Sequence, residues 1–581
     1  MQGARGAMDN KDIAAVFDEI ADLLDLQGVA FKPVAYRRAA RNIESMEDDI
    51  NKLAAEGKLE EIPGVGQNMA KKIEELLKTG KLEYLVKLRS EVPKGLVELL
   101  RVPDVGPKTA MVLHKELGIS SIEQLKEAVL NHKLRAIKGF GEKTEERILQ
   151  GIRALESKGG RTLLGIALPV AEAYVGYLKQ RQVLDLISVA GSLRRGKETV
   201  GDIDILVGDD EPAAIMDAFV SYPEVEAVLM KGPTKSSVRL KNGLQVDMRA
   251  VETKSWGAAL CYFTGSKEHN VSMRRMGVEM GLKLNEYGLF ERGSGKMVAG
   301  AEEEDVYKAL GLAYIEPELR ENSGELEASR EGRLPDLVKP DEIRGDLHVH
   351  TNWSDGADKL DDVVLAALAK GYEYIAITDH SQSLRIAKGL SPDRLTKQID
   401  AVRRANDAAG GRIRVLAGSE VDIRGDGSLD FPRTLLRELD VVIGSVHSGF
   451  KRDKREMTDR IVKAIESGMM DVLGHPTGRL IGQRNPYEVD LDKIFEAAKS
   501  NDVSLEINSF YDRLDLSDVN CRLAKEAGVR MAIGTDAHSV YQMDYIRYGI
   551  ITARRGWLEK ENIINTVRGK AIIRELHGGR R

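Results

Sequence analysis

The sequence predicts a multidomain protein with three architectures in succession: an all-α N-terminal region of repeated helical hairpins, an α/β middle region, and a C-terminal parallel barrel of seven β/α units. Three observations predict this. A helix–turn–helix pattern with a glycine turn recurs three times, two strand-like segments carry aspartates in alternation, and seven β-branched segments then alternate with helical ones. A chain of 581 residues is too long for one core, which agrees with several domains.

The composition is that of a globular protein, with 42% hydrophobic and 31% charged residues. No stretch approaches the roughly 18 apolar residues of a membrane span, and no signal-peptide pattern is visible at the start. Cys261 and Cys521 are the two cysteines, so we expect no disulfide framework and a cytoplasmic protein. The net charge of −6 does not decide nucleic-acid binding, which depends on local patches.

The N-terminal repeat consists of residues 59–77, 99–117 and 134–152. Each copy has a short turn that ends in glycine and then an amphipathic helix. The glycines Gly64, Gly66, Gly106 and Gly141 allow the backbone to approach a ligand closely. The helix that follows directs free N–H groups at an anion, so the pattern favours phosphate binding.

This repeat resembles the helix-hairpin-helix element, which holds DNA phosphates without reading sequence. An ordinary helical hairpin is the alternative for one copy, but three copies argue against it. We therefore expect a DNA-end-binding domain at 8–90 and a second helical DNA-binding domain at 91–158, with K⁺ or Na⁺ as candidate ions at the turns. The basic helix at 35–46, which contains Tyr36, is expected to line a groove for a DNA end.

The middle region carries a pattern typical of nucleotidyl transfer. Residues 203–208 read as a strand, and alternation places Asp202 and Asp204 on one face. Residues 243–252 alternate again and add Asp247. Three converging carboxylates repel one another unless cations lie between them, which predicts two Mg²⁺ (or Mn²⁺) ions. Gly191, Ser192 and Arg195 are then expected to hold a triphosphate.

Together with residues 262–275 and 284–290, these motifs resemble the palm of family X DNA polymerases, the group that contains DNA polymerase beta. The resemblance implies a nucleotidyltransferase palm at 159–253 and a small α/β thumb, which binds the nascent base pair, at 254–317. It implies that Asp202, Asp204 and Asp247 are catalytic metal ligands and that Arg274 contacts DNA. The nucleotide-binding residues that it implies are Ser192, Arg195, Gly201, Arg161, Tyr262, Phe263 and Asn270.

Some positions depart from the family pattern. Gln245 stands where polymerase beta has a basic residue, and Lys267 replaces an acidic one. Lys72 matches the Schiff-base lysine of the family's sugar-phosphate lyase, whose chemistry needs a lowered pKa. Asn68, however, replaces a lysine that helps to hold the 5′-phosphate, so a lyase and a merely solvated lysine both remain open.

Residues 318–342 are charged, poor in aromatics and interrupted by prolines, which predicts an interdomain tether. Seven strand-like segments follow it, and most of them are followed by a helical pattern. They are residues 343–350, 372–380, 413–420, 439–447, 470–475, 503–509 and 529–538. Such alternation predicts a parallel β/α barrel.

Six of the ten histidines lie at the carboxyl ends of these strands, with three carboxylates at comparable positions. That rim is where active sites of β/α barrels form. Nitrogen and oxygen ligands without cysteine favour two or three Zn²⁺ or Mn²⁺ ions. The predicted ligands are His348, His350, Asp355, His380, Glu420, His447, His475, Asp536 and His538.

These motifs resemble the polymerase-and-histidinol-phosphatase (PHP) domain, placed here at 343–577, with all nine of its usual ligand positions filled. The resemblance implies phosphoester hydrolysis and, beside a family X polymerase, 3′–5′ exonuclease and abasic-site (AP) endonuclease activity. Arg479 and Arg484 are weaker candidates for phosphate contacts.

The sequence thus predicts a DNA-directed DNA polymerase with a metal-dependent 3′–5′ exonuclease, active in DNA repair. Its expected partners are gapped or 3′-recessed double-stranded DNA and deoxynucleoside triphosphates, with no membrane and a monomeric state. Two alternatives stay open. One is a DNA-tethered PHP phosphoesterase for small phosphomonoesters, and the other is an end-binding scaffold with weak polymerase activity.

Overall fold

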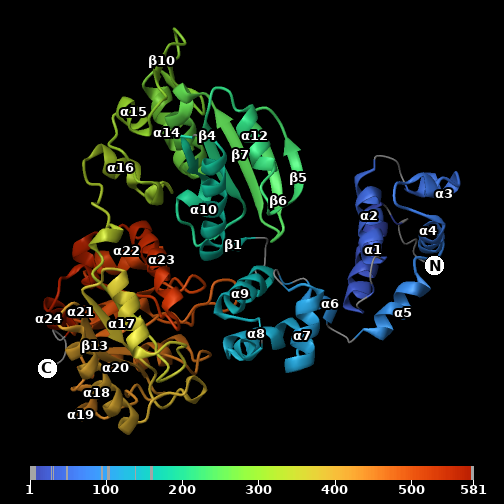
Figure 1. The fold of residues 1–581 in the computed structure, drawn as a ribbon. Coiled ribbons are helices and arrows are strands. Elements are labelled where there is room, and N and C mark those ends of the chain that lie inside the picture. The colour runs from blue at the N-terminus through green and yellow to red at the C-terminus, as the bar shows by residue number, and fades with distance from the viewer. Residues whose placement is uncertain are drawn as a thin grey trace. The chain divides into compact units, whose positions relative to one another are not determined.

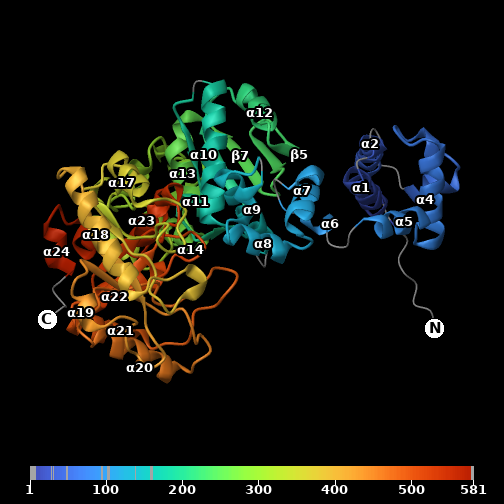
Figure 2. The same ribbon diagram turned by 60° about the horizontal axis from the view of Figure 1, so that its bottom comes forward.

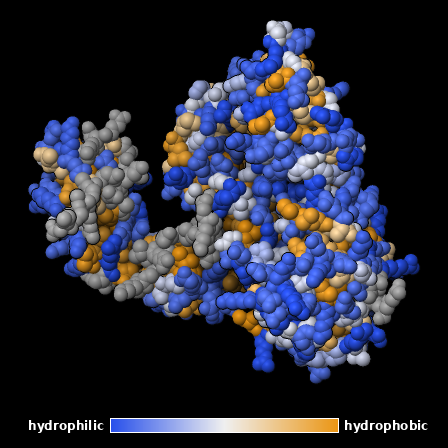
Figure 3. Space-filling model, turned by 180° about the vertical axis from the view of Figure 1, so that it is seen from behind, coloured by the Kyte–Doolittle hydropathy of each residue, from blue (hydrophilic) through white to orange (hydrophobic). Residues whose placement is uncertain are grey.

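The computed structural model describes residues 8, 10–27, 29, 32–46, 50–92, 96–100, 102, 105–137, 139–156, 161–182 and 184–576. Contacts divide the chain into two compact units, Met1–Glu156 and Ser157–Arg581. Across the described residues, no helix combines the length and the apolar character that crossing a bilayer requires. Hydrophilic residues dominate the face seen in Figure 3, with smaller apolar areas between them.

The first unit is all-α, as predicted (Figure 1). Its core is formed by aliphatic residues from all of its longer helices, among them Ile13, Ile73 and Leu113. The helices are α1 (Asn10–Leu26), α2 (Lys32–Ser45), α3 (Ile50–Ala55), α4 (Gln67–Thr79), α5 (Glu83–Glu91), α6 (Leu96–Leu99), α7 (Pro107–Leu117), α8 (Ile122–Leu130) and α9 (Glu142–Glu156).

The three predicted hairpin turns share one backbone geometry, which confirms the repeat. In each turn, a backbone N–H donates to the carbonyl of the residue three positions earlier, at 3.0 Å. The pairs are Val65 to Ile62, Val105 to Val102 and Phe140 to Ile137. A helix, α4, α7 or α9, starts directly after each turn. Gly64 (φ +87°) and Gly139 (φ +97°) take the left-handed conformation that glycine allows.

The second unit begins with the palm, a five-stranded sheet in the order β2-β4-β7-β6-β5. Strands β4 and β7 are parallel and the other pairs are antiparallel. Ile203, Ile205 and Val207 are buried on one face of β4, and helices α10 and α12 lie beside the sheet (Figure 1). The bounds are α10 (Leu164–Arg181), β2 (Ile187–Val189), α11 (Gly191–Arg194), β4 (Ile203–Gly208), α12 (Ala213–Val220), β5 (Val225–Lys231), β6 (Lys235–Leu240) and β7 (Gln245–Val251). Strand β1 (Thr162–Leu163) pairs separately with β3 (Thr199–Val200).

A smaller α/β part follows the palm, as predicted. Its antiparallel sheet has the order β10-β9-β8 and packs with helices around Met273, Leu289 and Tyr307. The elements are α13 (Trp256–Thr264), α14 (Lys267–Glu279), β8 (Leu282–Asn285), β9 (Gly288–Glu291), β10 (Met297–Ala299) and α15 (Glu303–Ala309).

The prediction of a tether at 318–342 is wrong. The segment is packed into the second unit and includes a short helix, α16 (Glu325–Arg330). Leu319, Leu326 and Leu337 join the core of the preceding part. Arg320 is fully buried, donates to the carbonyl of Ile315 and pairs with Glu303. The spaced leucines pack this otherwise polar stretch into the core, and the buried charge is tolerated because it is paired. The overall composition of the stretch does not reveal either feature.

The C-terminal part is the predicted barrel, with seven parallel strands in sequential order. Backbone bonds from Asp536 to His348 and from His350 to Ala537 join the ends of β17 and β11. The strands are β11 (Gly345–Val349), β12 (Tyr374–Ile377), β13 (Arg414–Asp422), β14 (Val441–Ser445), β15 (Val472–Leu473), β16 (Ser504–Asn508) and β17 (Met531–Gly534).

Helices that lie between the barrel strands or follow the last one cover the outside of the barrel (Figure 2). Val363, Ile399, Ile461 and Ile494 from these helices share one buried cluster with strand residues. The helices are α17 (Leu360–Ala369), α18 (Pro392–Ala409), α19 (Arg433–Leu436), α20 (Lys454–Ile465), α21 (Leu491–Ser500), α22 (Asp518–Ala527), α23 (Ile546–Arg555) and α24 (Ala571–Leu576).

Palm and barrel pack tightly within the second unit. A Cβ on Gly165 of α10 would lie 2.3 Å from the Tyr511 side chain, and one on Gly196 would lie 2.2 Å from Ile551 of α23. The Tyr548 hydroxyl donates to the carbonyl of Gly165 at 3.3 Å. The absence of side chains at these two glycines is therefore what allows the close approach.

One buried ion-pair network supports this unit and has a predictable pH dependence. Burial alone would raise the pKa of Glu303, but Arg194 and Arg320 hold that pKa at about 2. Replacing Glu303 with Gln should lower the free energy of unfolding by about 3–5 kcal/mol at pH 7, because the buried Arg320 and the partly buried Arg194 lose their partner. Chemical denaturation measures this directly.

The sign of the pH effect follows from the lowered pKa. The unfolded carboxyl takes up a proton near its ordinary pKa of 4.5, whereas the folded one resists it until about 2. The advantage of the natural chain over Glu303→Gln should therefore be full above pH 5 and shrink toward pH 2. Glu304→Gln, at the exposed neighbouring position, is the control. An advantage that stays constant between pH 7 and pH 3 would contradict this assignment.

Candidate active sites in the palm and the barrel

The three predicted aspartates of the palm converge. Asp204 and Asp247 are register partners on the parallel strands β4 and β7, and Asp202 directly precedes β4. One carboxylate oxygen from each lies within 4.8 Å of the others. The alternation argument therefore placed these side chains correctly.

The electrostatics of this cluster favour a cation. Burial, followed by the charges of Asp202 and Asp247, raises the pKa of Asp204 to about 6. Few nearby groups offset this negative charge. Lys235 Nζ lies 3.9 Å from Asp247, and the Gln245 amide donates to Asp247 at 2.9 Å. Three carboxylates with so little compensation form a donor set that suits hard divalent ions.

Position 191 requires glycine because the Asp204 carboxylate lies against it. Its φ is +61°, and a Cβ there would lie 2.2 Å from Asp204 Oδ2. Ser192, which was predicted to hold the triphosphate, follows in the short helix α11. Arg195 is differently engaged: it donates to Glu321 at 3.0 Å and to the carbonyl of Thr264 at 2.7 Å.

One of the other predicted nucleotide contacts lies beside the cluster, and two more are linked to it. Phe263 lines a cavity of about 160 Å³ together with Asp204 and Asp247. The Tyr262 and Phe263 rings pack edge to face at 5.2 Å, and the Asn270 amide donates to the carbonyl of Tyr262 at 2.7 Å.

Two arginines lie at the edges of this group. Arg274, which was predicted to contact DNA, is exposed on α14. Arg161 donates to Thr199 and lies 3.8 Å from where a Cβ on Gly201 would be.

In the first unit the structure corrects one expectation. The Tyr36 side chain is 6% exposed and packs edge to face on Phe17, so it belongs to the core and not to a DNA groove. Its helix buries this side because an apolar stripe faces α1. Gly66, Gly106 and Gly141 lie in open space, where a Cβ would meet nothing within 4 Å.

Lys72 lies on α4, with its amine over the Tyr84 ring at 4.8 Å and 3.2 Å from the carbonyl of Asn68. Burial, and to a smaller extent the charge of Lys32, lowers its pKa.

In the barrel, the predicted ligands gather at the carboxyl ends of the strands. Eight of them fall into three overlapping groups whose donor atoms lie within 4.8 Å of one another: His350 with Asp355, His380 and His538; His348 with His350 and Asp536; and His380 with Glu420 and His447. His475 joins through Glu420, at 2.9 Å.

Glu420 is the centre of this arrangement. Its carboxylate lies 2.8 Å from His380 and 3.1 Å from His447. Burial would raise the pKa of this carboxyl, but the surrounding imidazoles, His447 foremost, hold it well below its ordinary value. With five imidazoles within 4.0 Å, this buried carboxylate therefore stays charged.

Two further observations fit a metal cluster here. Among the described residues, the buried imidazole nitrogens without a hydrogen-bond partner are His348 Nε2, His350 Nδ1, His380 Nδ1 and His475 Nδ1. His475 and Asp536 also take positive φ values, +26° and +55°, which cost non-glycine residues of order 1–3 kcal/mol each. Unpaired buried nitrogens and a strained backbone are both typical of a metal-binding site.

Sequence reasoning missed the residues that hold these ligands. Glu506 lies 2.6 Å from His348 Nδ1, and Asp422 lies 2.8 Å from His447 Nδ1, which turns the other nitrogen of each ring toward the cluster. Arg513 lies 3.6 Å from Asp536. Asp422 could have been found, because it shares a strand face with Glu420.

Comparison with known proteins agrees with this geometry. Over 561 residues the chain is 38% identical to the DNA polymerase/3'-5' exonuclease PolX of Bacillus subtilis (strain 168), and the alignment covers 96% of the chain and 97% of the relative. The chain belongs to the PolX family of DNA polymerases.

Family models divide this PolX chain much as the structure does. A helix-hairpin-helix domain matches residues 8–82 and a SAM-like helix-hairpin-helix tandem matches 96–154. The DNA polymerase beta thumb matches 259–321, and the PHP domain matches 346–510.

Other relatives match a smaller part of the chain. A probable phosphatase of Thermoanaerobacter sp. (strain X514) is 30% identical over 240 residues, which are 39% of this chain and 91% of that protein. The probable phosphatase YcdX of Shigella flexneri is 32% identical over 213 residues, 34% of this chain and 80% of that protein.

The contact between Gly191 and Asp204 gives a test specific to the palm. Gly191→Ala should lower primer extension at least tenfold, because the new methyl group must displace Asp204 and the left-handed backbone costs a further 1–2 kcal/mol or so. Degradation of 3′ ends by the same preparation should not change.

Gly176→Ala on α10 is the matched control, since a Cβ there meets nothing within 4 Å. Equal extension rates for Gly191→Ala and the natural chain would show that Asp204 need not hold this position.

Proposed function

We propose that the palm extends DNA 3′ ends with deoxynucleotides and that the barrel removes nucleotides from 3′ ends. The observation that carries this is the presence of two separate ligand clusters, one of carboxylates and one mainly of imidazoles, in one packed unit. A relative that is aligned over 97% of its own length is named for both activities, which supports the same pair here.

In the palm, a primer 3′-hydroxyl attacks the α-phosphorus, the new P–O bond forms and pyrophosphate leaves. Two Mg²⁺ or Mn²⁺ ions, held by Asp202, Asp204 and Asp247, would lower the hydroxyl's pKa and neutralise the leaving group. Gly191 leaves room for Asp204, Phe263 closes one wall of the cavity, and Asn270 fixes the backbone beside it.

In the barrel, water adds across the P–O3′ bond, and a nucleoside monophosphate leaves. Two or three Zn²⁺ or Mn²⁺ ions on the nine predicted ligands would lower the pKa of that water and bind the phosphate oxygens. Glu506 and Asp422 keep two imidazoles in the tautomer that a cation needs, and Arg513 offers a cationic group beside Asp536.

The proposal also covers the form of the DNA substrate and the ions at the helical hairpins. The glycine turns of the first unit present their backbone to open space, which suits gapped or 3′-recessed DNA held through phosphates, with K⁺ or Na⁺ at the turns. AP endonuclease activity, a role in repair and a monomeric state belong to the same proposal.

Two double substitutions separate the activities. Asp202→Ala with Asp204→Ala should abolish extension of a labelled, gapped duplex and spare its 3′ degradation. His348→Ala with His350→Ala should do the reverse, because the two clusters share no ligand. Metal analysis and assays in Mg²⁺, Mn²⁺ and Zn²⁺ identify the ions.

Each alternative predicts a different result. Phosphate release from histidinol phosphate, without DNA hydrolysis, would favour a phosphomonoesterase in the barrel. Extension that survives loss of Asp202 and Asp204 would end the polymerase assignment.

A second proposed activity is sugar-phosphate lyase chemistry at Lys72. Burial lowers the pKa of this lysine, which favours the neutral amine, whereas the cation–π contact with the Tyr84 ring at 4.8 Å favours the ammonium. The amine attacks the aldehyde carbon of a ring-opened abasic sugar, water leaves and a Schiff base forms.

Borohydride trapping on DNA with a 5′-deoxyribose phosphate measures this. Lys72→Arg should lose the covalent adduct, whereas Lys71→Arg, at the exposed neighbouring position, should keep it. Equal trapping by both variants would move the nucleophile elsewhere.

A further inference from the structure

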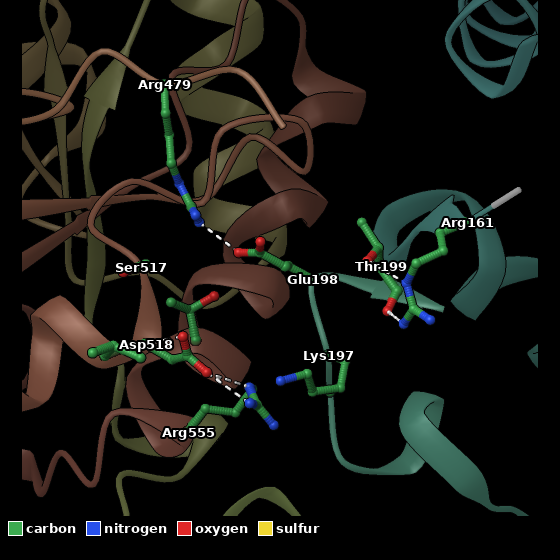
Figure 4. Close-up of a pocket in the computed structure, with 11 residues that line it drawn as sticks. Arg161, Lys197, Glu198, Thr199, Arg479, Ser517, Asp518 and Arg555 are labelled. Atoms are coloured by element: carbon green, nitrogen blue, oxygen red, sulfur yellow. Dashed lines mark hydrogen bonds and ion pairs between the residues drawn. The ribbon is translucent and has the colours of Figure 1, made fainter. Parts of the chain in front are cut away.

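A cavity of about 390 Å³ lies between the palm and the barrel and contains none of the predicted metal ligands (Figure 4). Its palm side consists of Arg161 and residues 196–199. Its barrel side consists of Arg479, residues 517–519, Thr552 and Arg555. The cavity therefore exists because these two parts of the chain are packed together.

The lining is positively charged. Four cationic side chains face two carboxylates, and each carboxylate already pairs with one arginine: Glu198 with Arg479 at 2.8 Å, and Asp518 with Arg555 at 2.6 Å. Arg161 donates to Thr199, a neutral partner. Lys197 lies 3.8 Å from its nearest carboxylate, Glu321, which does not line the cavity. A net charge of two is thus left for a ligand, and the ligand must be anionic.

Three features of the lining fit a phosphate in particular. Lys197 points into the space between palm and barrel, and its side chain is 37% exposed, so it is accessible (Figure 4). Residues 517–519 begin the ten-residue helix α22, whose positive dipole end favours an anion. The lining has no aromatic side chain on which a base could stack.

Both sides of the cavity lie close in the sequence to residues of the two active sites. Residues 196–199 lead within three residues to Asp202, and Arg161 approaches Gly201. On the other side, Arg479 belongs to the loop that leaves β15 just after His475. The cavity is therefore lined by segments that lead directly to ligands of both centres.

We propose that the cavity binds a backbone phosphate of the DNA strand whose 3′ end is transferred between the polymerase and exonuclease centres. The inference rests on the proposed function, since it needs both activities. Arg161 and Lys197 supply the charge, and the tight palm–barrel contact keeps them facing Arg479 and Arg555.

The test follows one DNA encounter. Primers with a mismatched 3′ nucleotide are bound, a heparin trap is added with Mn²⁺ and nucleotides, and the fraction that is both trimmed and extended is measured. The yield is normalised to each variant's own separately assayed rates of extension and degradation. Loss of the proposed function would show in those separate assays, before any transfer is scored.

Lys197→Ala should lower the normalised transfer yield about tenfold, as expected for one lost charge-assisted phosphate contact. Lys197→Arg should restore most of it. Lys241→Ala, at another half-exposed palm lysine that does not line the cavity, should leave the yield unchanged. Because Lys197 is partly exposed, its loss should not change the melting temperature.

A second arm identifies the phosphate. Neutral methylphosphonate linkages are placed one at a time along the primer strand. One position should lower the transfer of the natural chain to the Lys197→Ala level and have no further effect in that variant. An increased KM for deoxynucleoside triphosphates with normal transfer would instead assign the cavity to a nucleotide. Transfer that is insensitive to both Lys197 and every linkage would overturn the proposal.

Discussion

Arg555 is the residue on which the joint architecture of palm and barrel depends. It lies on the barrel helix α23, and its side chain is 6% exposed. It binds Asp518 of the barrel, Glu321 of the packed segment beyond the thumb, and the carbonyl of Arg195 in the palm at 2.7 Å. A planar guanidinium can satisfy these acceptors at once, which a lysine cannot.

Through Arg555, the chain joins a site for DNA synthesis and a site for DNA degradation that share no ligand. The palm offers three carboxylates on adjacent parallel strands, a set that hard ions such as Mg²⁺ prefer. The barrel offers imidazoles around the buried Glu420, a set that suits Zn²⁺ or Mn²⁺. Different donor chemistry allows each centre to select its own ions, so one chain can build and remove the same 3′ end.

The sequence predicted those parts of the fold that depend on local periodicity. Alternation placed Asp204 beside Asp247, and the strand-end rule gathered His350, His380 and His538. It failed where a residue's role depends on a distant partner. Arg320 is polar in any local pattern, yet Glu303 makes its burial tolerable.

Arg195 shows the same limit at the active site. It was predicted to hold a triphosphate, but its guanidinium pairs with Glu321. If it turns to a triphosphate, the partly buried Glu321 keeps Arg555 at 3.1 Å and Lys197 at 3.8 Å, so the carboxylate is not left unpaired. The usual penalty for breaking a buried ion pair, about 3–5 kcal/mol, is thereby largely avoided. The barrel's arginine thus makes a nucleotide-dependent movement of the palm's arginine energetically feasible, which gives a physical reason for fusing the two domains.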